Sequence, residues 1–299
     1  MGQILLSAVS LGLLWSVLVL GVYVTYKVLD IADLTVEGSI VLGAAVAASM
    51  IRGGHNPAAA TIAAFFAGSI AGLVTAVLHT KLKIPALLAG ILTMTALWSV
   101  NLRVMNSANV SILRIPTVFT AFTNLGVSKY AAWIILGGSV SLLLVFALYW
   151  FFGTELGGAI RATGINKNMV RAQGINTDTM MIIGLMISNA LVALSGALIA
   201  QSQSFADVQM GMGSIVIGLA SLIVGEVLLG RRFFLVRLLS VIFGAVVYRV
   251  IIALVMEFGM VPNDLKLFTA ITVTVALSVP YISAAVKQRA GARDGGGHA

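Results

Sequence analysis

The chain has no cysteine and very few charged residues. With no cysteine among 299 residues, disulfide bonds and thiol chemistry are excluded. Only 9% of the residues are Asp, Glu, Lys or Arg, against about 25% in an ordinary soluble protein. The hydrophobic share is 60% and the mean hydropathy is +1.06. These values exclude a soluble globular domain and predict a membrane protein.

Motifs for nucleotide hydrolysis and metal catalysis are also missing. The sequence contains no GxxxxGK[ST] phosphate loop and no HExxH pair. Its three histidines, His55, His79 and His298, lie in separate loops or in the tail. We therefore predict no catalytic residue, no metal site and no cofactor in this chain. Energy for any transport has to come from an ion gradient or from another protein.

Long apolar runs are the dominant feature that is present. At roughly 20 residues per crossing, the hydrophobic share, about 180 residues, is enough for roughly nine helices. Runs such as AAWIILGGSVSLLLVFALYWFF are apolar on every face, which favours helices over the strands of an outer-membrane barrel. We predict an all-α polytopic membrane protein with about eight to nine transmembrane helices. It forms one integral domain over 1–285, followed by a flexible cytoplasmic tail over 286–299. The predicted spans are 4–26, 36–51, 57–78, 84–104, 130–152, 180–200, 211–229, 234–256 and 266–285.

The net charge of +8 reports membrane orientation rather than nucleic-acid binding. Basic residues gather in alternate loops, and such loops face the cytoplasm under the positive-inside rule. This places a short N-terminus outside and the C-terminus in the cytoplasm. The basic residues at or near the cytoplasmic face are Lys27, Lys81, Lys83, Arg161, Lys167, Arg171, Arg231, Arg232, Arg237, Lys287, Arg289 and Arg293.

The second predicted span is short and emerges from the polar stretch DLTVEGS, which begins at Asp33. This pattern predicts a broken or re-entrant helix. Non-helical backbone at membrane depth is tolerated only where protein covers it or where it lines a cavity. We therefore expect the break to lie in the protein interior.

Polar residues inside the spans are candidates for a translocation pathway. Most such side chains form hydrogen bonds between helices, and some line a path for cargo. For Arg249, a snorkelling or helix-pairing role is weighed against a role in substrate binding or gating. Small residues such as Gly68 and Gly72 predict close helix packing. The candidate pathway residues are Glu37, Thr95, Trp98, Asn101, Asn189 and Ser221.

One polar and basic island, the segment 154–178, interrupts the apolar sequence. AIRATGI and KNMVRAQ each predict a short helical turn, and Gly174 predicts a stop before the next span. Such a segment can dock into a groove of a soluble partner, lie on anionic lipid, or be a plain connecting loop.

The island resembles the cytoplasmic coupling segment of ABC importer permeases of the branched-chain amino acid and ribose type. In that family a Gly, an Arg-Ala pair, an Asn and a following Ala-x-Gly-Ile-Asn recur in this order, and the stretch over 33–48 resembles the family's second-helix signature. One departure is LLGRRFFLVR, where the family often has a glycine-rich turn. The residues that the resemblance identifies as ATPase-coupling are Glu155, Gly158, Arg161, Ala162, Gly164, Asn166, Arg171, Gly174 and Asn176.

The resemblance implies a permease in the bacterial plasma (inner) membrane that imports a small solute, an amino acid of aromatic or branched-chain type. It implies three kinds of protein partner: a separate ATPase subunit that holds ATP and Mg, an extracellular or periplasmic substrate-binding protein, and a second permease copy in a homodimer. An ion-gradient-driven secondary transporter is the main alternative. A non-transporting scaffold or membrane-embedded enzyme is a further one.

Overall fold

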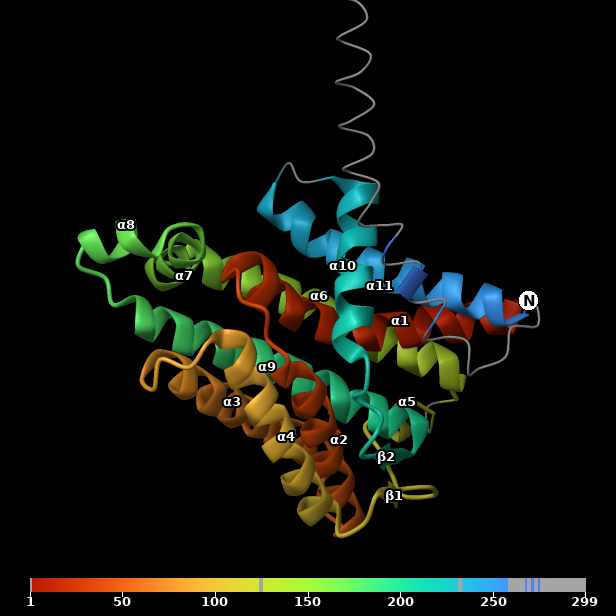
Figure 1. Ribbon diagram of the computed structural model, residues 1–299. Helices are drawn as coiled ribbons and strands as arrows, with labels where there is room; N and C mark the ends of the chain where they lie inside the picture. Colours follow the sequence, from red (N-terminus) through yellow and green to blue (C-terminus); the bar gives the residue numbers. More distant parts are fainter. Residues whose placement is uncertain are drawn as a thin grey trace, which may run out of the picture.

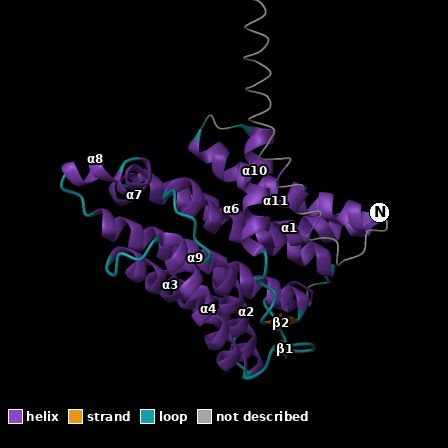
Figure 2. Cartoon of the chain, viewed as in Figure 1, coloured by secondary structure: helices purple, strands orange, loops and turns teal. Residues whose placement is uncertain are grey.

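The computed structural model describes residues 2–123, 126–230 and 233–257, together with residues 267, 270, 271 and 274. Helices dominate this part of the chain, as predicted (Figures 1 and 2). They are α1 (Gly2–Tyr23), the π-helix η1 (Val24–Val28), α2 (Thr35–Arg52), α3 (Pro57–Thr80), α4 (Ala86–Met105), α5 (Thr120–Thr123), α6 (Lys129–Gly153), α7 (Glu155–Ile165), α8 (Lys167–Ala172), α9 (Thr177–Gln203), α10 (Ser214–Leu229) and α11 (Phe234–Glu257).

Seven helices in the described part are long and apolar enough to cross a membrane, which confirms a polytopic helical protein. They are α1 with η1, α2, α3, α4, α6, α9 and α11. The predicted span over 211–229 corresponds to α10, which has only 16 residues and is about 24 Å long. The predicted span over 266–285 lies outside the described residues, apart from isolated positions.

The helices form a bundle in which α9 separates two groups. On one side of α9 lie α2, α3 and α4, and on the other lie α1, α6, α10 and α11 (Figure 1). The N-terminus lies at one end of the bundle, and α7 and α8 lie at the opposite end. We call the latter the basic end, and its members include Lys27, Lys81, Lys83, Arg161, Lys167 and Arg171.

Glycine allows α9 to touch its neighbours backbone to backbone. A Cβ at Gly68 or Gly72 of α3 would lie 2.3 Å from the carbonyl oxygens of Asn189 and Leu185, respectively. A Cβ at Gly43 of α2 would lie 1.9 Å from the carbonyl oxygen of Ala193. Because no hydrophobic drive pulls helices together in lipid, such close approach supplies the packing energy. The prediction of close packing at Gly68 and Gly72 is confirmed.

The chain breaks between η1 and α2, as the polar stretch predicted. After Val28 it passes through Leu29–Leu34 before α2 begins at Thr35. Leu29, Ile31 and Asp33 in this segment are buried, whereas Asp30 and Ala32 are exposed, so protein covers one side of the break. We call Leu29–Leu34 the re-entrant segment. The π-helical geometry of η1 was not predicted; single-turn π segments are frequent at functional sites.

A small two-stranded sheet closes the end of the bundle opposite the basic end. Strand β1 (Asn109–Ser111) pairs antiparallel with β2 (Phe205–Asp207), with Val110 opposite Ala206. An all-helical expectation missed this ribbon because each strand is only three residues long. It ties the segment after α4 to the segment after α9.

Candidate functional site

The island predicted to couple to an ATPase folds into α7 and α8 at the basic end. Its helices begin at side-chain caps: Asn166 Oδ1 accepts the backbone N–H groups of Asn168 and Met169, each at 3.1 Å. Asn176 caps α9 in the same way. Gly174 adopts φ of +81°, a backbone conformation that favours glycine. These three residues therefore set where helices start and stop.

Most of the predicted coupling residues are exposed and leave a mixed apolar and basic surface. We call the exposed part of α7 and α8 the α7–α8 surface. Ile165, at the end of α7, is 85% exposed, and Met169 is 45% exposed. The Arg161 guanidinium lies 4.7 Å from the ring of Phe234, which holds this cation beside α11. The exposed predicted residues are Glu155, Gly158, Arg161, Asn166, Arg171, Gly174 and Asn176, whereas Ala162 and Gly164 are half-buried.

A small charged cluster attaches α8 to the rest of the basic end. Arg171 Nε donates to Thr177 Oγ1 at 2.9 Å, and its guanidinium lies 3.6 Å from Asp178. Lys83, from the loop before α4, lies 3.2 Å from the same carboxylate. Ion pairs that solvent reaches contribute at most about 1 kcal/mol. The cluster therefore orients the segment and adds little stability.

Gly164 brings α7 into direct contact with the start of the re-entrant segment. A Cβ at this position would lie 1.9 Å from the carbonyl oxygen of Val28 and 3.0 Å from Leu29 Cα. Only a hydrogen in place of a side chain allows this approach. The salt bridge between Lys27 and Glu226, at 3.1 Å, fixes the same region to α10.

A buried polar network holds the re-entrant segment near the middle of α9. Asp33 Oδ1 accepts the backbone N–H of Thr35 at 2.9 Å, and Asp33 Oδ2 accepts from Asn189 Nδ2 at 2.8 Å. Asn189 Oδ1 in turn accepts from Ser39 at 2.7 Å. Asn189, predicted as a pathway residue, therefore lies within helix packing and binds α2 to α9.

Glu37, in the first turn of α2, reaches the start of α10. Its Oε1 accepts the backbone N–H of Gly213 at 3.0 Å. Gly213 is the residue before α10 and has φ of +79°. A carboxylate at a helix N-terminus meets unsatisfied N–H groups and the positive end of the helix dipole. Glu37 thus joins the first turn of α2 to the start of α10 inside the bundle.

Four of the six predicted pathway residues line one cavity between α2, α4 and the segment before α10. It has a volume of about 220 Å³. Ser221 lies elsewhere: its carbonyl oxygen packs against Gly244, where α10 meets α11. We call this cavity the Glu37 cavity. Its lining residues are Glu37, Gly38, Val41, Met94, Thr95, Trp98, Asn101, Val208 and Met212.

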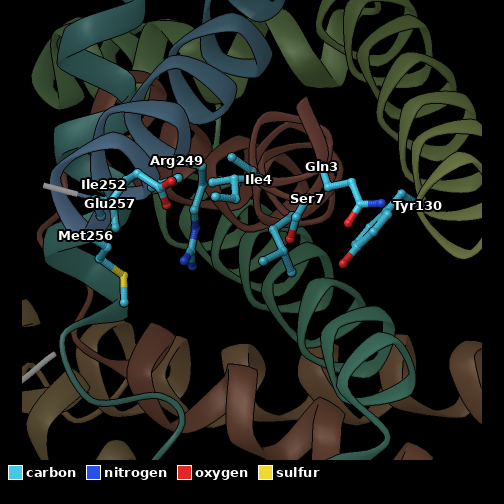
Figure 3. A pocket seen from close by; sticks show the side chains of 11 residues that line it. Gln3, Ile4, Ser7, Tyr130, Arg249, Ile252, Met256 and Glu257 are labelled. Carbon is cyan, nitrogen blue, oxygen red and sulfur yellow. The ribbon is translucent and has the colours of Figure 1, made fainter. Parts of the chain in front are cut away.

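A second cavity, of about 460 Å³, contains Arg249 (Figure 3). It is formed by α1, α6 and α11 near the N-terminal end, with Gln3 and Tyr130 on its wall. The Arg249 guanidinium lies 4.1 Å from the ring of Trp15, a cation–π contact. This contact supports the helix-pairing interpretation of Arg249.

Comparison with known proteins identifies the family. The family model described as "Branched-chain amino acid transport system / permease component" matches residues 4–278. A tyrosine transport system permease protein of Clostridioides difficile is 38% identical over 95% of this chain and 94% of its own length. An uncharacterized protein of Rickettsia prowazekii is 35% identical over 92% of this chain and 97% of its own length.

A more distant relative is also a permease, in agreement with the family match. An autoinducer 2 import system permease protein of Yersinia pestis is 28% identical over 53% of this chain and 44% of its own length. No solved structure matches the chain. Because the family model spans nearly all of the bundle described above, the chain belongs to the family of permease components of branched-chain amino acid transport systems.

Proposed function

We propose that this chain is the permease of an amino acid importer in which α7 and α8 receive the motion of the ATPase. A permease component is one part of a larger ABC transport system in the bacterial inner membrane, with a separate ATPase subunit and a substrate-binding protein as partners. The observation that carries the proposal is the contact of Gly164 with Val28. It links the exposed α7–α8 surface to the re-entrant segment.

The link from the α7–α8 surface to the Glu37 cavity is short. Val28 touches α7, Asp33 lies against Asn189, and Glu37 lines the cavity. Only nine residue positions separate Val28 from Glu37 in the sequence. A displacement of α7 therefore acts on the start of α2 through a few packed residues, which is a hinge-type transition of the kind that alternates access.

An amino acid is the proposed solute. The relative that matches almost the full chain is named a tyrosine transport system permease protein. Four predicted pathway residues meet in a cavity too small for a drug-sized ligand, which requires about 300 Å³ or more. A cavity of this size suits a small solute with one apolar group.

The assembly is proposed to contain two copies of this permease, two ATPase subunits and one binding protein. The basic end is proposed to face the cytoplasm, because Lys and Arg are enriched in cytoplasmic loops. The α7–α8 surface then meets the ATPase, and the β1–β2 end faces the binding protein. The same orientation places the C-terminus, which lies outside the described residues, in the cytoplasm.

Replacing Ile165 with aspartate is expected to prevent capture of the ATPase. Ile165 is 85% exposed, so the change buries no charge in the permease itself. At an interface, a newly buried and unpaired charge costs several kcal/mol, so we expect roughly a hundredfold weaker binding or more. The measurement is co-purification of the ATPase with tagged permease, with the stoichiometry determined by native mass spectrometry.

Leu113→Asp is the matched control, because Leu113 is 66% exposed at the opposite end of the bundle. It should leave ATPase recovery unchanged. Equal recovery with both variants would contradict docking at the α7–α8 surface. Recovery of the unmodified permease without any ATPase, under conditions that keep a known importer intact, would revive the ion-gradient-driven alternative.

A further inference from the structure

We propose that the Glu37 cavity is a subsite for the ammonium group of a small amine with an apolar side chain. The inference rests on the proposed function and deepens it by naming the group of the solute that this permease recognises. Three observations carry it: a carboxylate without an ion-pair partner among the described residues, an unsatisfied buried amide oxygen, and a third acceptor, the hydroxyl of Thr95, beside apolar walls.

The first observation is the carboxylate of Glu37. Within the described residues, no Lys or Arg forms an ion pair with it. It accepts the backbone N–H groups of Gly213 and Ile215 at the start of α10. A carboxylate has about four acceptor sites, so capacity for further donors remains. Charged side chains inside a membrane pair with another charge or line a path for substrate. A cationic ligand would supply the missing partner.

The second observation is Asn101 in α4. Its side chain is only 1% exposed, and its Nδ2 donates to the carbonyl oxygen of Gly38 at 3.2 Å. That contact fixes which end of the amide is the oxygen, since the reverse orientation would set oxygen against oxygen. Asn101 Oδ1 has no hydrogen-bond partner in the described part of the chain. Leaving a buried acceptor unsatisfied lowers the folding equilibrium constant by roughly 5-fold to 150-fold, so a donor is expected to occupy it in some state.

The third observation is the hydroxyl of Thr95, together with the apolar walls. Thr95 Oγ1 donates its only hydrogen to the carbonyl oxygen of Ile91 at 2.8 Å, so it offers lone pairs to the cavity. Glu37, Thr95 and Asn101 are therefore all acceptors. A primary ammonium carries three N–H donors and matches this set. A donor-poor solute such as a neutral ether or a carboxylate does not.

The remaining lining sets the character of the rest of the ligand. Val41, Met94, Trp98 and Met212 form apolar walls, and the volume of about 220 Å³ equals roughly seven water volumes. Trp98 is an aromatic lining residue, and aromatic rings attract cations to their faces. Among the described residues, no Lys or Arg lines the cavity, so a ligand carboxylate gains no ion pair with them. The amine should therefore be recognised even without the carboxylate of an amino acid.

The test uses the absence of natural cysteine. A single cysteine is introduced as Thr95→Cys, which lines the cavity, and as Ser99→Cys, an exposed position on the same helix that does not line it. The rate of labelling by a thiol reagent is measured on the purified permease complex in nanodiscs. The probes are L-tyrosine, tyramine, which lacks the carboxylate, and 3-(4-hydroxyphenyl)propionate, which lacks the ammonium.

We expect tyramine and L-tyrosine to slow labelling at Thr95→Cys roughly tenfold when present at ten times their dissociation constant. The propionate should have no effect, and labelling at Ser99→Cys should not change with any probe. Adding Glu37→Gln to Thr95→Cys keeps an acceptor for Gly213 but removes the charge. It should weaken protection by tyramine about tenfold or more.

Three results would overturn the inference. The first is equal protection by the propionate and tyramine, which would show that the ammonium is not the recognised group. The second is absence of protection by either amine. The third is full protection that survives Glu37→Gln in a complex of normal size. Because ATPase capture by the Ile165 and Leu113 variants is measured separately, a failure here leaves the importer proposal standing, and the converse also holds.

Discussion

Replacing Gly164 with alanine is expected to lower ATP-driven uptake by the complete transporter about tenfold. The added Cβ would lie 1.9 Å from the carbonyl oxygen of Val28, which is main chain and has no rotamer to escape into. Overpacking of this kind costs about 1–3 kcal/mol and is relieved by moving α7 away from the re-entrant segment. The assay is uptake of radiolabelled amino acid into proteoliposomes that contain permease, ATPase and binding protein. ATPase activity should persist, because the α7–α8 surface itself is unaltered.

Gly153→Ala, at the last residue of α6, is the matched control because Gly153 is not among the predicted coupling residues. A Cβ at Gly153 meets nothing within 4 Å. Because the added methyl group displaces no neighbour, this variant should transport normally. Normal uptake by Gly164→Ala would show that the contact with Val28 does not transmit motion. Equal loss in both variants would show that the loss does not come from the contact between Gly164 and Val28.

Gly43→Ala is expected to lower the thermal unfolding temperature of the purified permease by roughly 5 °C. A Cβ at Gly43 would lie 1.9 Å from the carbonyl oxygen of Ala193, and Gly196 makes the reciprocal approach to Ile40. The substitution therefore forces α2 and α9 apart along their crossing. In lipid this close packing is the main source of helix association, so little else compensates. Unfolding is followed by intrinsic fluorescence in detergent.

The control for this packing is Gly138→Ala in α6. The nearest atom to a Cβ at Gly138 is Leu13 Cδ1 at 3.8 Å, an ordinary van der Waals contact at the end of a flexible side chain. This variant should unfold at the unmodified temperature or slightly above it. An unchanged temperature for Gly43→Ala would mean that α2 and α9 can separate at no cost, contrary to the tight crossing described above.

Much of the helical framework could be predicted from hydropathy. Seven predicted spans correspond to helices α1, α2, α3, α4, α6, α9 and α11. These segments are predominantly apolar, and in lipid a single segment can satisfy its own backbone only as a helix. The break before α2 was predictable for the converse reason, because DLTVEGS is too polar to face lipid. The β1–β2 ribbon left no signal, since its pairing is between segments about 100 residues apart.

For the functional residues too, the sequence predicted local features but not contacts between distant segments. Residue types within the island predicted its capped helices, because Asn166, Gly174 and Asn176 act on backbone only a few positions away. Polarity inside an apolar span identified Glu37, Thr95, Trp98 and Asn101 as pathway candidates. It did not predict that these four residues line the same cavity. It also selected Asn189 and Ser221, which pack between helices. Polarity alone does not distinguish a side chain that faces a cavity from one that faces another helix.

Hydropathy and residue type were enough to establish that this protein is helical, crosses a membrane and contains one polar and basic segment. These properties follow from local composition, because burial in lipid acts on each segment separately. The contacts of Gly164 with Val28, of Asp33 with Asn189 and of Glu37 with Gly213 became visible only in the folded structure. Such contacts join positions that are distant in the sequence. They form because glycine lets the crossing helices approach backbone to backbone.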